Sequence, residues 1–174
     1  VLECLETLIP LAPLHLPSNL EGIKSGQEVF PASKPIAVFD TAFHTTLPEC
    51  ETTYALPHDL CQKHSIRRYG FHGMNPAYVS QKAATYLKVK SFTGVVMHLG
   101  SGASMCAIEN GASRATTMGM TPLGGLIMGT RSGDMDPGVV LYLAQTLKKT
   151  PKELETMLNH QSGLKGLSGK EDMR

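Results

Sequence analysis

Residues 95–117 read VVMHLGSGASMCAIENGASRATT, and this stretch decides the fold. Its apolar start is typical of a buried strand, and that strand runs into a glycine-rich turn. Asn110 and Gly111 then separate residues 104–108 from residues 113–117, and Asn-Gly is a strong hairpin signal because both residues tolerate left-handed conformations. The stretch therefore predicts three consecutive antiparallel strands whose first turn exposes backbone N–H groups suited to a phosphate.

Further elements are predicted on both sides of this meander. Residues 35–40 form an apolar run ended by Asp40, which indicates a buried strand that presents a carboxylate at its end. Residues 1–9 are typical of a helix end, and the prolines that follow, up to Pro17, argue against a long helix beyond residue 10. Helices are predicted at about 57–64, 76–88, 136–147 and 151–160, with Asn75 capping the second.

Composition limits the class of protein. With 174 residues and 41% hydrophobic content, the chain can bury one sizeable core or two smaller ones. Sixteen basic residues against 15 acidic residues leave no field for nucleic acid or an anionic membrane, so small molecules are the expected partners. No apolar run is long enough to span a bilayer, and four scattered cysteines without a CxxC pair favour a reducing cytoplasm. The start at Val1 and the end at Arg174 suggest a fragment.

The densest candidate site is the loop of residues 128–137, MGTRSGDMDP. Its glycines hold Arg131 beside two carboxylates, and the planar guanidinium suits phosphoryl transfer because it meets two oxygens at once and stays charged. The alternative is a surface turn in which Arg131 pairs with Asp134 or Asp136.

Two histidine-containing segments are further candidates. His72 lies between small residues in RYGFHG and can donate a hydrogen bond or move a proton, or it can be a structural loop histidine. Asp40 precedes His44 by four residues and can orient a metal-bound nucleotide, although Asp is also a common strand terminator. A zinc site built from His44, His58, His64 and His72 is conceivable, but no HExxH-like spacing supports it.

The glycine pair in HLGSGAS, residues 98–104, is a weak signal alone, and the phosphate-binding and plain-turn interpretations are evenly matched. No GxxxxGK[ST] loop, protein-kinase motif set or GxSxG elbow occurs in the sequence. Any phosphate chemistry therefore needs another architecture.

Taken together, the segments resemble the acetate kinase family, which belongs to the sugar kinase, actin and Hsp70-like ATPases. The resemblance covers nearly the whole chain, and its most diagnostic parts are MGMTP at 118–122 and GTRSG at 129–133. The other matching segments are LIPLAPLH at 8–15, FDTAFH at 39–44, YGFHG at 69–73, HLG at 98–100 and SGL at 162–164.

The resemblance implies an α/β fold of ribonuclease H-like domains, each a mixed sheet with flanking helices. Residues 1–44 would end the first domain, and residues 45–174 would begin the second. The implied enzyme transfers the ATP γ-phosphoryl group reversibly to acetate, giving acetyl phosphate and ADP, with Mg²⁺. It would be a cytoplasmic homodimer that acts on a small carboxylate and a nucleotide.

Site roles follow from the same resemblance. Arg131 and His72 would stabilise the transferring phosphoryl group, with Asp40 as an active-site carboxylate near the metal and the acid. His98 would line the phosphate side, and Gly100, Ser101 and Gly102 would lie against the ATP phosphates. The alkyl end of the acid would enter a small apolar pocket formed by Leu14, Phe71 and Pro122.

The chain departs from the family pattern at several positions. Ser101 stands where the family has asparagine, and Pro76 and Met74 replace a histidine and a small hydroxyl residue. Family members also carry a serine-rich phosphate loop and an arginine before the matching region, and an adenine site and a metal-linked glutamate after it. The alternatives are a propionate or butyrate kinase and a truncated, non-catalytic nucleotide-binding module.

Overall fold

The computed structural model describes residues 1–9, 12 and 15–172. The chain divides into two compact units, Val1–Phe39 and Asp40–Arg174, each of which is described by itself. The predicted domain division after residue 44 remains a prediction. In the part of the chain that the structure describes, no helix has both the length and the apolar character needed to cross a membrane.

The first unit contains two helices, α1 (Leu2–Thr7) and α2 (Leu16–Val29). The predicted helix end in residues 1–9 is confirmed by α1. The expectation of no long helix beyond residue 10 is wrong, because α2 has 14 residues and places Pro17 in its first turn. A proline there loses no intrahelical hydrogen bond, since the first N–H groups of a helix have no partner within it.

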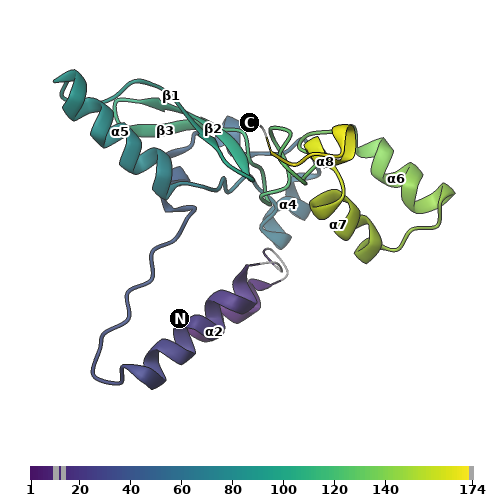
Figure 1. Cartoon of the computed structure of the whole chain (residues 1–174), viewed down its shortest axis with the longest axis horizontal. Coiled ribbons are helices and arrows are strands. Elements are labelled where there is room, and N and C mark those ends of the chain that lie inside the picture. Colours follow the sequence, from purple (N-terminus) through teal and green to yellow (C-terminus); the bar gives the residue numbers. More distant parts are fainter. Residues whose placement is uncertain (10–11, 13–14, 173–174) are drawn as a thin grey trace. The chain divides into compact units, whose positions relative to one another are not determined.

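Residues 35–40 do not form the predicted buried strand. The segment carries no helix or strand and is drawn as a bare trace in Figure 1. Ile36 and Val38 are 83% and 68% exposed. A strand requires hydrogen bonds to a neighbouring strand, and the described residues place none beside this segment. An apolar sequence alone does not supply that partner.

The second unit contains the predicted meander. Strands β1 (Gly94–Leu99), β2 (Ala103–Glu109) and β3 (Ala112–Thr116) form an antiparallel sheet in the order β1-β2-β3 (Figure 1). The Asn-Gly turn is confirmed, with φ of 51° at Asn110 and 79° at Gly111. The chain is thus an α/β protein, while the mixed sheet expected from the resemblance remains a prediction.

The predicted helices of this unit are confirmed within a few residues. They are α4 (His58–His64), α5 (Met74–Leu87), α6 (Pro137–Thr146) and α7 (Pro151–His160), and the structure adds η2 (Ala42–Thr46), α3 (Glu49–Thr52) and α8 (Gly163–Ser168). The predicted Asn75 cap is wrong, because α5 begins two residues earlier with Gly73 as its N-cap. At α7, Thr150 and Glu153 form a capping box that satisfies two otherwise unpaired backbone N–H groups.

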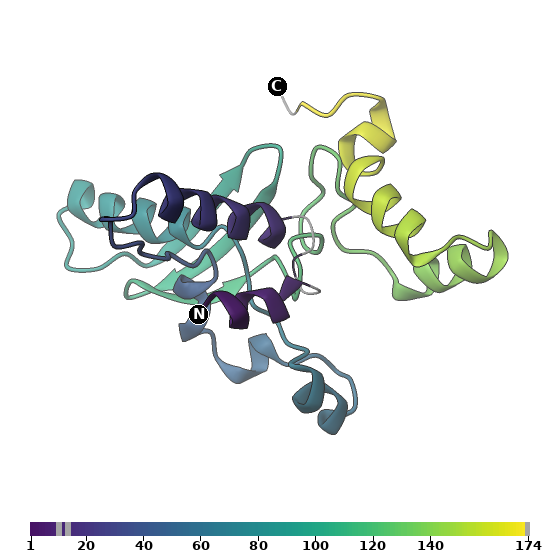
Figure 2. The same cartoon turned by 90° about the horizontal axis from the view of Figure 1, so that it is seen from below.

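Helix α5 packs along β1 (Figure 1), and α6 contacts α7, the next helix in the chain (Figure 2). The apolar side chains of the sheet form two clusters. One contains Val96, Cys106 and Ile108 with Phe43 and Phe92. The other contains Ala103, Met118 and Met128 with Phe71 and Leu126. Met128 of the second cluster contacts Nη1 of Arg131 through its sulfur at 3.7 Å.

Arg68 ties the segment before His72 to the end of β3. Its guanidinium donates to the carbonyl oxygens of Thr116, Thr117 and Met118 at 3.1, 3.2 and 2.9 Å, and to the main-chain carbonyl oxygen of Glu51 at 2.9 Å. A single arginine thereby satisfies four backbone carbonyl groups and joins the segment before His72 to α3 and to the end of β3.

Gly70 makes the closest approach in this region. Its φ is +69°, and a Cβ atom there would lie 2.7 Å from His44 Cδ2 and 2.7 Å from Thr116 Cγ2. Both the left-handed backbone and the missing side chain are therefore required.

We expect Gly70→Ala to lower the free energy of unfolding by about 2 to 4 kcal/mol, because it adds backbone strain to overpacking. Gly22→Ala is the matched control, since Gly22 lies inside α2 with nothing within 4 Å of the added Cβ. The control should gain about 0.5 to 1 kcal/mol from helix propensity. Urea denaturation measures both, and equal effects of the two substitutions would contradict this account.

Candidate functional site

The turn at His72 is held in an unusual backbone conformation by Asp40. His72 has φ of 59°, which is uncommon for a residue with a side chain. Its N–H donates to Oδ2 of Asp40 at 2.7 Å, and the N–H of Gly73 donates to the carbonyl oxygen of Asp40 at 2.9 Å. A Cβ at Gly73 would collide with that carbonyl oxygen. Asp40 therefore belongs to the site although no strand delivers it.

The His72 ring lies against β1 and β2. It stacks on the His98 ring with centroids 4.1 Å apart and planes inclined by 27°. Its Nδ1 is 2.9 Å from Oγ of Ser104. His98 and Ser104 are directly opposite each other in the β1–β2 pairing, so the ring meets both members of one cross-strand pair.

Gly102 brings this histidine pair to Arg131. A Cβ built on Gly102 would lie 3.3 Å from both Cε1 and Nε2 of His72, and 3.6 Å from Nη1 of Arg131. His72 and Arg131 thus flank Gly102, with His98 stacked on His72 and Asp40 bound to the His72 backbone. Gly100 shapes the turn by donating its N–H to the Gly102 carbonyl at 2.9 Å, which leaves Ser101 and Gly102 as the turn's candidate donors.

The Arg131 guanidinium is half-buried and oriented by backbone groups. Its Nη1 donates to the carbonyl oxygen of Pro122 at 2.9 Å and lies 3.7 Å from Sδ of Met128. The N–H of Gly129 donates to the carbonyl oxygen of Ser101 at 3.0 Å, which joins the arginine loop to the glycine turn. Two predicted loops are therefore connected by direct hydrogen bonds.

The arginine loop is also attached to the end of α7, which sequence reasoning missed. The Thr130 hydroxyl donates to the carbonyl of Asn159 at 2.8 Å, and the N–H of Ser132 donates to that of Leu158 at 3.1 Å. Gly163 has φ of +62°, and a Cβ there would lie 2.6 Å from the Arg131 carbonyl oxygen. The SGL segment at 162–164 is part of the family resemblance, but its spacing in the sequence gives no sign of this contact.

The alternative in which Arg131 pairs with a neighbouring carboxylate does not hold. Oδ1 of Asp134 accepts the N–H of Gly125 at 2.6 Å, and Oδ1 of Asp136 accepts the N–H of Gly138 at 2.8 Å. Neither acid forms an ion pair with Arg131 among the described residues. Both carboxylates shape the backbone around the loop.

Burial lowers the pKa of both donors in the site, His72 and Arg131. Burial lowers the pKa of His72 from its ordinary 6.5, and nearby His98 and Arg131 lower it further, against the opposing effect of Asp40. His72 is therefore neutral near pH 7. Burial also lowers the pKa of Arg131, but a guanidinium stays protonated under these conditions. The site presents one fixed cation beside a neutral imidazole.

His44 lies behind the site and does not enter it. The side chain is 2% exposed, with Nε2 at 3.0 Å from the Phe71 carbonyl oxygen and Nδ1 at 2.9 Å from Oγ of Ser113. Both ring nitrogens are thus engaged within the core. In the described part of the chain, no group of three or more His, Cys, Asp or Glu side chains is placed to hold a metal ion.

The three residues predicted to form the acyl pocket differ in where the structure places them. Phe71 is half-buried and packs on the cluster of Ala103, Met118 and Met128. Pro122 meets the site through its carbonyl oxygen, which accepts from Arg131. Leu14 lies outside the described residues.

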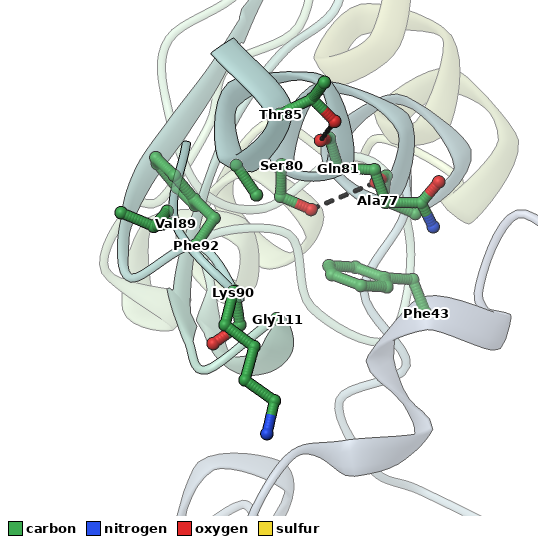
Figure 3. Close-up of a pocket in the computed structure, with 11 residues that line it drawn as sticks. Phe43, Ala77, Ser80, Gln81, Thr85, Val89, Lys90, Phe92 and Gly111 are labelled. Carbon is green, nitrogen blue, oxygen red and sulfur yellow. Dashed lines mark hydrogen bonds between the residues drawn. The ribbon is translucent and has the colours of Figure 1, made fainter. Parts of the chain in front are cut away.

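A separate pocket of about 300 Å³ lies between α5, the segment that follows it, Phe43 and Gly111 (Figure 3). None of the predicted site residues lines it. Two of its hydroxyl groups already donate within α5, Ser80 to Ala77 and Thr85 to Gln81, both at 3.0 Å. Lys90 extends away from the other lining residues in Figure 3, so the pocket offers no convergent polar chemistry.

The sequence profile of the Acetokinase family matches residues 1–174. An acetate kinase from Sulfurovum sp. (strain NBC37-1) is 53% identical over 100% of this chain and 44% of its own length. The crystal structure of a propionate kinase from Francisella tularensis subsp. tularensis SCHU S4 superposes with a TM-score of 0.97 at 48% identity, covering 99% of this chain and 45% of that one.

The acetate kinase of Porphyromonas gingivalis also superposes, with a TM-score of 0.89 at 44% identity, covering 98% of this chain and 44% of that one. The chain therefore spans less than half the length of the relatives it matches.

Protonation of the buried histidines should destabilise the protein. Burial lowers the pKa of both His44 and His72, so unfolding takes up protons as the pH falls below their ordinary 6.5. The free energy of unfolding should therefore be largest above about pH 6.5 and decrease towards about pH 5. Urea denaturation across this range measures the slope.

His44→Gln removes one of the two buried imidazoles and should make that slope smaller, although it lowers the stability itself by about 1 to 3 kcal/mol. A slope at least as steep in the variant would contradict the assignment.

Proposed function

The chain belongs to the acetokinase family, and from this we propose that the protein containing it transfers a phosphoryl group reversibly between ATP and acetate, giving acetyl phosphate and ADP. The observation that carries the proposal is the convergence at Gly102. His72 and Arg131 are 59 positions apart in sequence, yet both border the space where a Cβ of Gly102 would lie. A glycine between two donors leaves room for a phosphoryl group.

The reaction brings two anions together. A carboxylate oxygen of acetate forms a bond to the γ-phosphorus while the bond from that phosphorus to the β,γ-bridging oxygen breaks, and ADP leaves with the electron pair. The carboxylate is already ionised at pH 7, so no general base is needed. Catalysis therefore depends on positioning and on compensation of negative charge.

The residues of the site fit these needs. Arg131 is a half-buried, permanently charged donor, and the Pro122 carbonyl fixes its orientation. Because the guanidinium is partly buried, its charge acts in surroundings of lower dielectric constant than water. Neutral His72 adds a hydrogen-bond donor without further charge, beside His98. The N–H groups of Ser101 and Gly102 would meet ATP phosphate oxygens, with Gly100 shaping their turn.

Asp40 is the one carboxylate among the gathered residues. One of its oxygens accepts the N–H of His72, which leaves the other for a ligand. Mg²⁺ is commonly bound through one or two carboxylates together with substrate phosphates and waters, so Asp40 fits a nucleotide-bound Mg²⁺. When bound, Mg²⁺ would neutralise charge on the phosphates.

The remaining proposals concern the whole protein. We propose ribonuclease H-like domains divided near residue 44, with a homodimer as the assembled form. All four cysteines lie within the described residues and carry free thiols, which supports a reducing, cytoplasmic location. Phe71 and Pro122 would line the small pocket for the methyl group of acetate.

In the full-length enzyme, Arg131→Ala should lower kcat roughly a thousandfold while changing the KM for ATP little, because the guanidinium acts on charge that spreads in the transition state. Arg114→Ala is the control, since Arg114 forms an exposed ion pair with Glu109 on the far end of the meander. A steady-state assay of acetyl phosphate formation decides, and near-normal turnover in Arg131→Ala would defeat the proposal.

The non-catalytic module is tested by titrating the unsubstituted protein with ATP-Mg²⁺. Saturable binding without turnover would favour that alternative.

A second candidate is a propionate kinase, favoured by the TM-score of 0.97 to a propionate kinase. The two activities differ by one methylene in the acyl pocket, which is worth about 1 to 3 kcal/mol of discrimination. We expect kcat/KM to be highest for acetate and to fall about tenfold or more at butyrate. Comparative turnover with the C2 to C4 acids measures this, and a maximum at propionate would select the second candidate.

A further inference from the structure

We propose that Ser104 is a positioning residue that donates a hydrogen bond to Nδ1 of His72 and thereby keeps the imidazole proton on Nε2, beside Gly102 and Arg131. The catalytic consequence rests on the proposed function, but the position of the proton can be measured without any turnover.

The geometry begins with the β1–β2 hairpin. Ser104 is 4% exposed and pairs directly with His98, so the two side chains share one face of the sheet. His72 stacks on His98, and this places its Nδ1 at 2.9 Å from Oγ of Ser104. The Nε2 edge then borders the Gly102 position. One nitrogen of the ring is thus directed at the sheet, and the other lies beside the turn.

The direction of the hydrogen bond follows from the partners available. If Nδ1 carried the proton, the Ser104 oxygen would accept it and the hydroxyl hydrogen would need another acceptor. The described residues offer that hydroxyl no second partner. A buried donor without a partner is costly, whereas an unused lone pair costs less. The hydroxyl therefore donates to Nδ1, and neutral His72 carries its proton on Nε2.

His44 shows the same arrangement, and there the position of the ring proton follows from a carbonyl partner. Nε2 of His44 lies 3.0 Å from a carbonyl oxygen, which can only accept, so Nε2 must carry the proton. Nδ1 of His44 is then an acceptor, and Ser113 on β3 donates to it at 2.9 Å. Two adjacent strands therefore each contribute a buried serine that orients a histidine.

The tautomer determines what His72 offers to an anion. A proton on Nε2 presents an N–H donor next to Arg131, which suits a phosphoryl oxygen. The other tautomer would direct a lone pair at the same oxygen and repel it. One hydroxyl group in the sheet thus decides whether this imidazole attracts or repels the substrate.

The decisive measurement is a long-range proton–nitrogen correlation spectrum of the full-length protein labelled with ¹⁵N-histidine, which distinguishes protonated from unprotonated ring nitrogens. His72→Gln assigns the His72 signals by their loss. We expect unprotonated Nδ1 and protonated Nε2 in the unsubstituted protein. A His72 ring with its proton on Nδ1 would overturn the proposal.

Substitutions test whether Ser104 is the cause. Ser104→Ala should give a mixture of tautomers, and Ser104→Thr, which keeps the hydroxyl, should restore the Nε2–H form. Ser80→Ala is the matched control, because Ser80 is an equally buried serine whose hydroxyl donates to Ala77 within α5 (Figure 3). An unchanged tautomer in Ser104→Ala would contradict the proposal. If that variant fails to fold, the spectra of the unsubstituted protein and of Ser104→Thr still decide.

Kinetics supply a readout that a purely structural role would not move. Ser104→Ala should lower kcat about tenfold with little change in the KM for ATP. A protein with the expected spectra but no kinase activity would refute the proposed function and leave the positioning role intact.

Discussion

The two hydrogen bonds that Asp40 makes to the His72–Gly73 backbone are the constraint on which the site depends. One comes from the carboxylate and the other from the main-chain carbonyl, so side chain and backbone of one residue fix the same turn. This clamp holds His72 in a left-handed conformation that a histidine would otherwise leave. The turned backbone lays the imidazole against His98.

The rest of the site is assembled by close approaches that only glycine permits. Gly70 admits His44 beneath the turn, Gly102 leaves space between His72 and Arg131, and Gly163 admits the Arg131 carbonyl. Each contact joins segments that are far apart in sequence. The glycines therefore allow close contacts between elements, in addition to their role in turns, and a side chain at Gly102 would lie between the His72 imidazole and the Arg131 guanidinium.

Polar groups in the sheet and helices then orient the functional side chains. Ser104 contacts the His72 ring, the Pro122 carbonyl accepts from Arg131, and the end of α7 holds the arginine loop through Thr130. The hairpin prediction contained the signal for Ser104, because pairing two strands across residues 100–102 places it opposite His98. No comparable signal existed for Asn159, whose contact depends on how α7 packs.

By itself, the sequence determined the local elements: the Asn-Gly meander, the proline-started helices α6 and α7, and the segments whose resemblance identified the family. These features depend on neighbours a few residues apart, so their physics is local. Prediction from the sequence failed at residues 35–40, where an apolar run lacked a partner strand, and at Asn75, because Gly73 is the N-cap of α5. Only the tertiary structure decided that Asp40 anchors His72 through its backbone and that Arg131 avoids Asp134 and Asp136. Those outcomes depend on distances between remote segments, which composition and spacing along the chain do not encode.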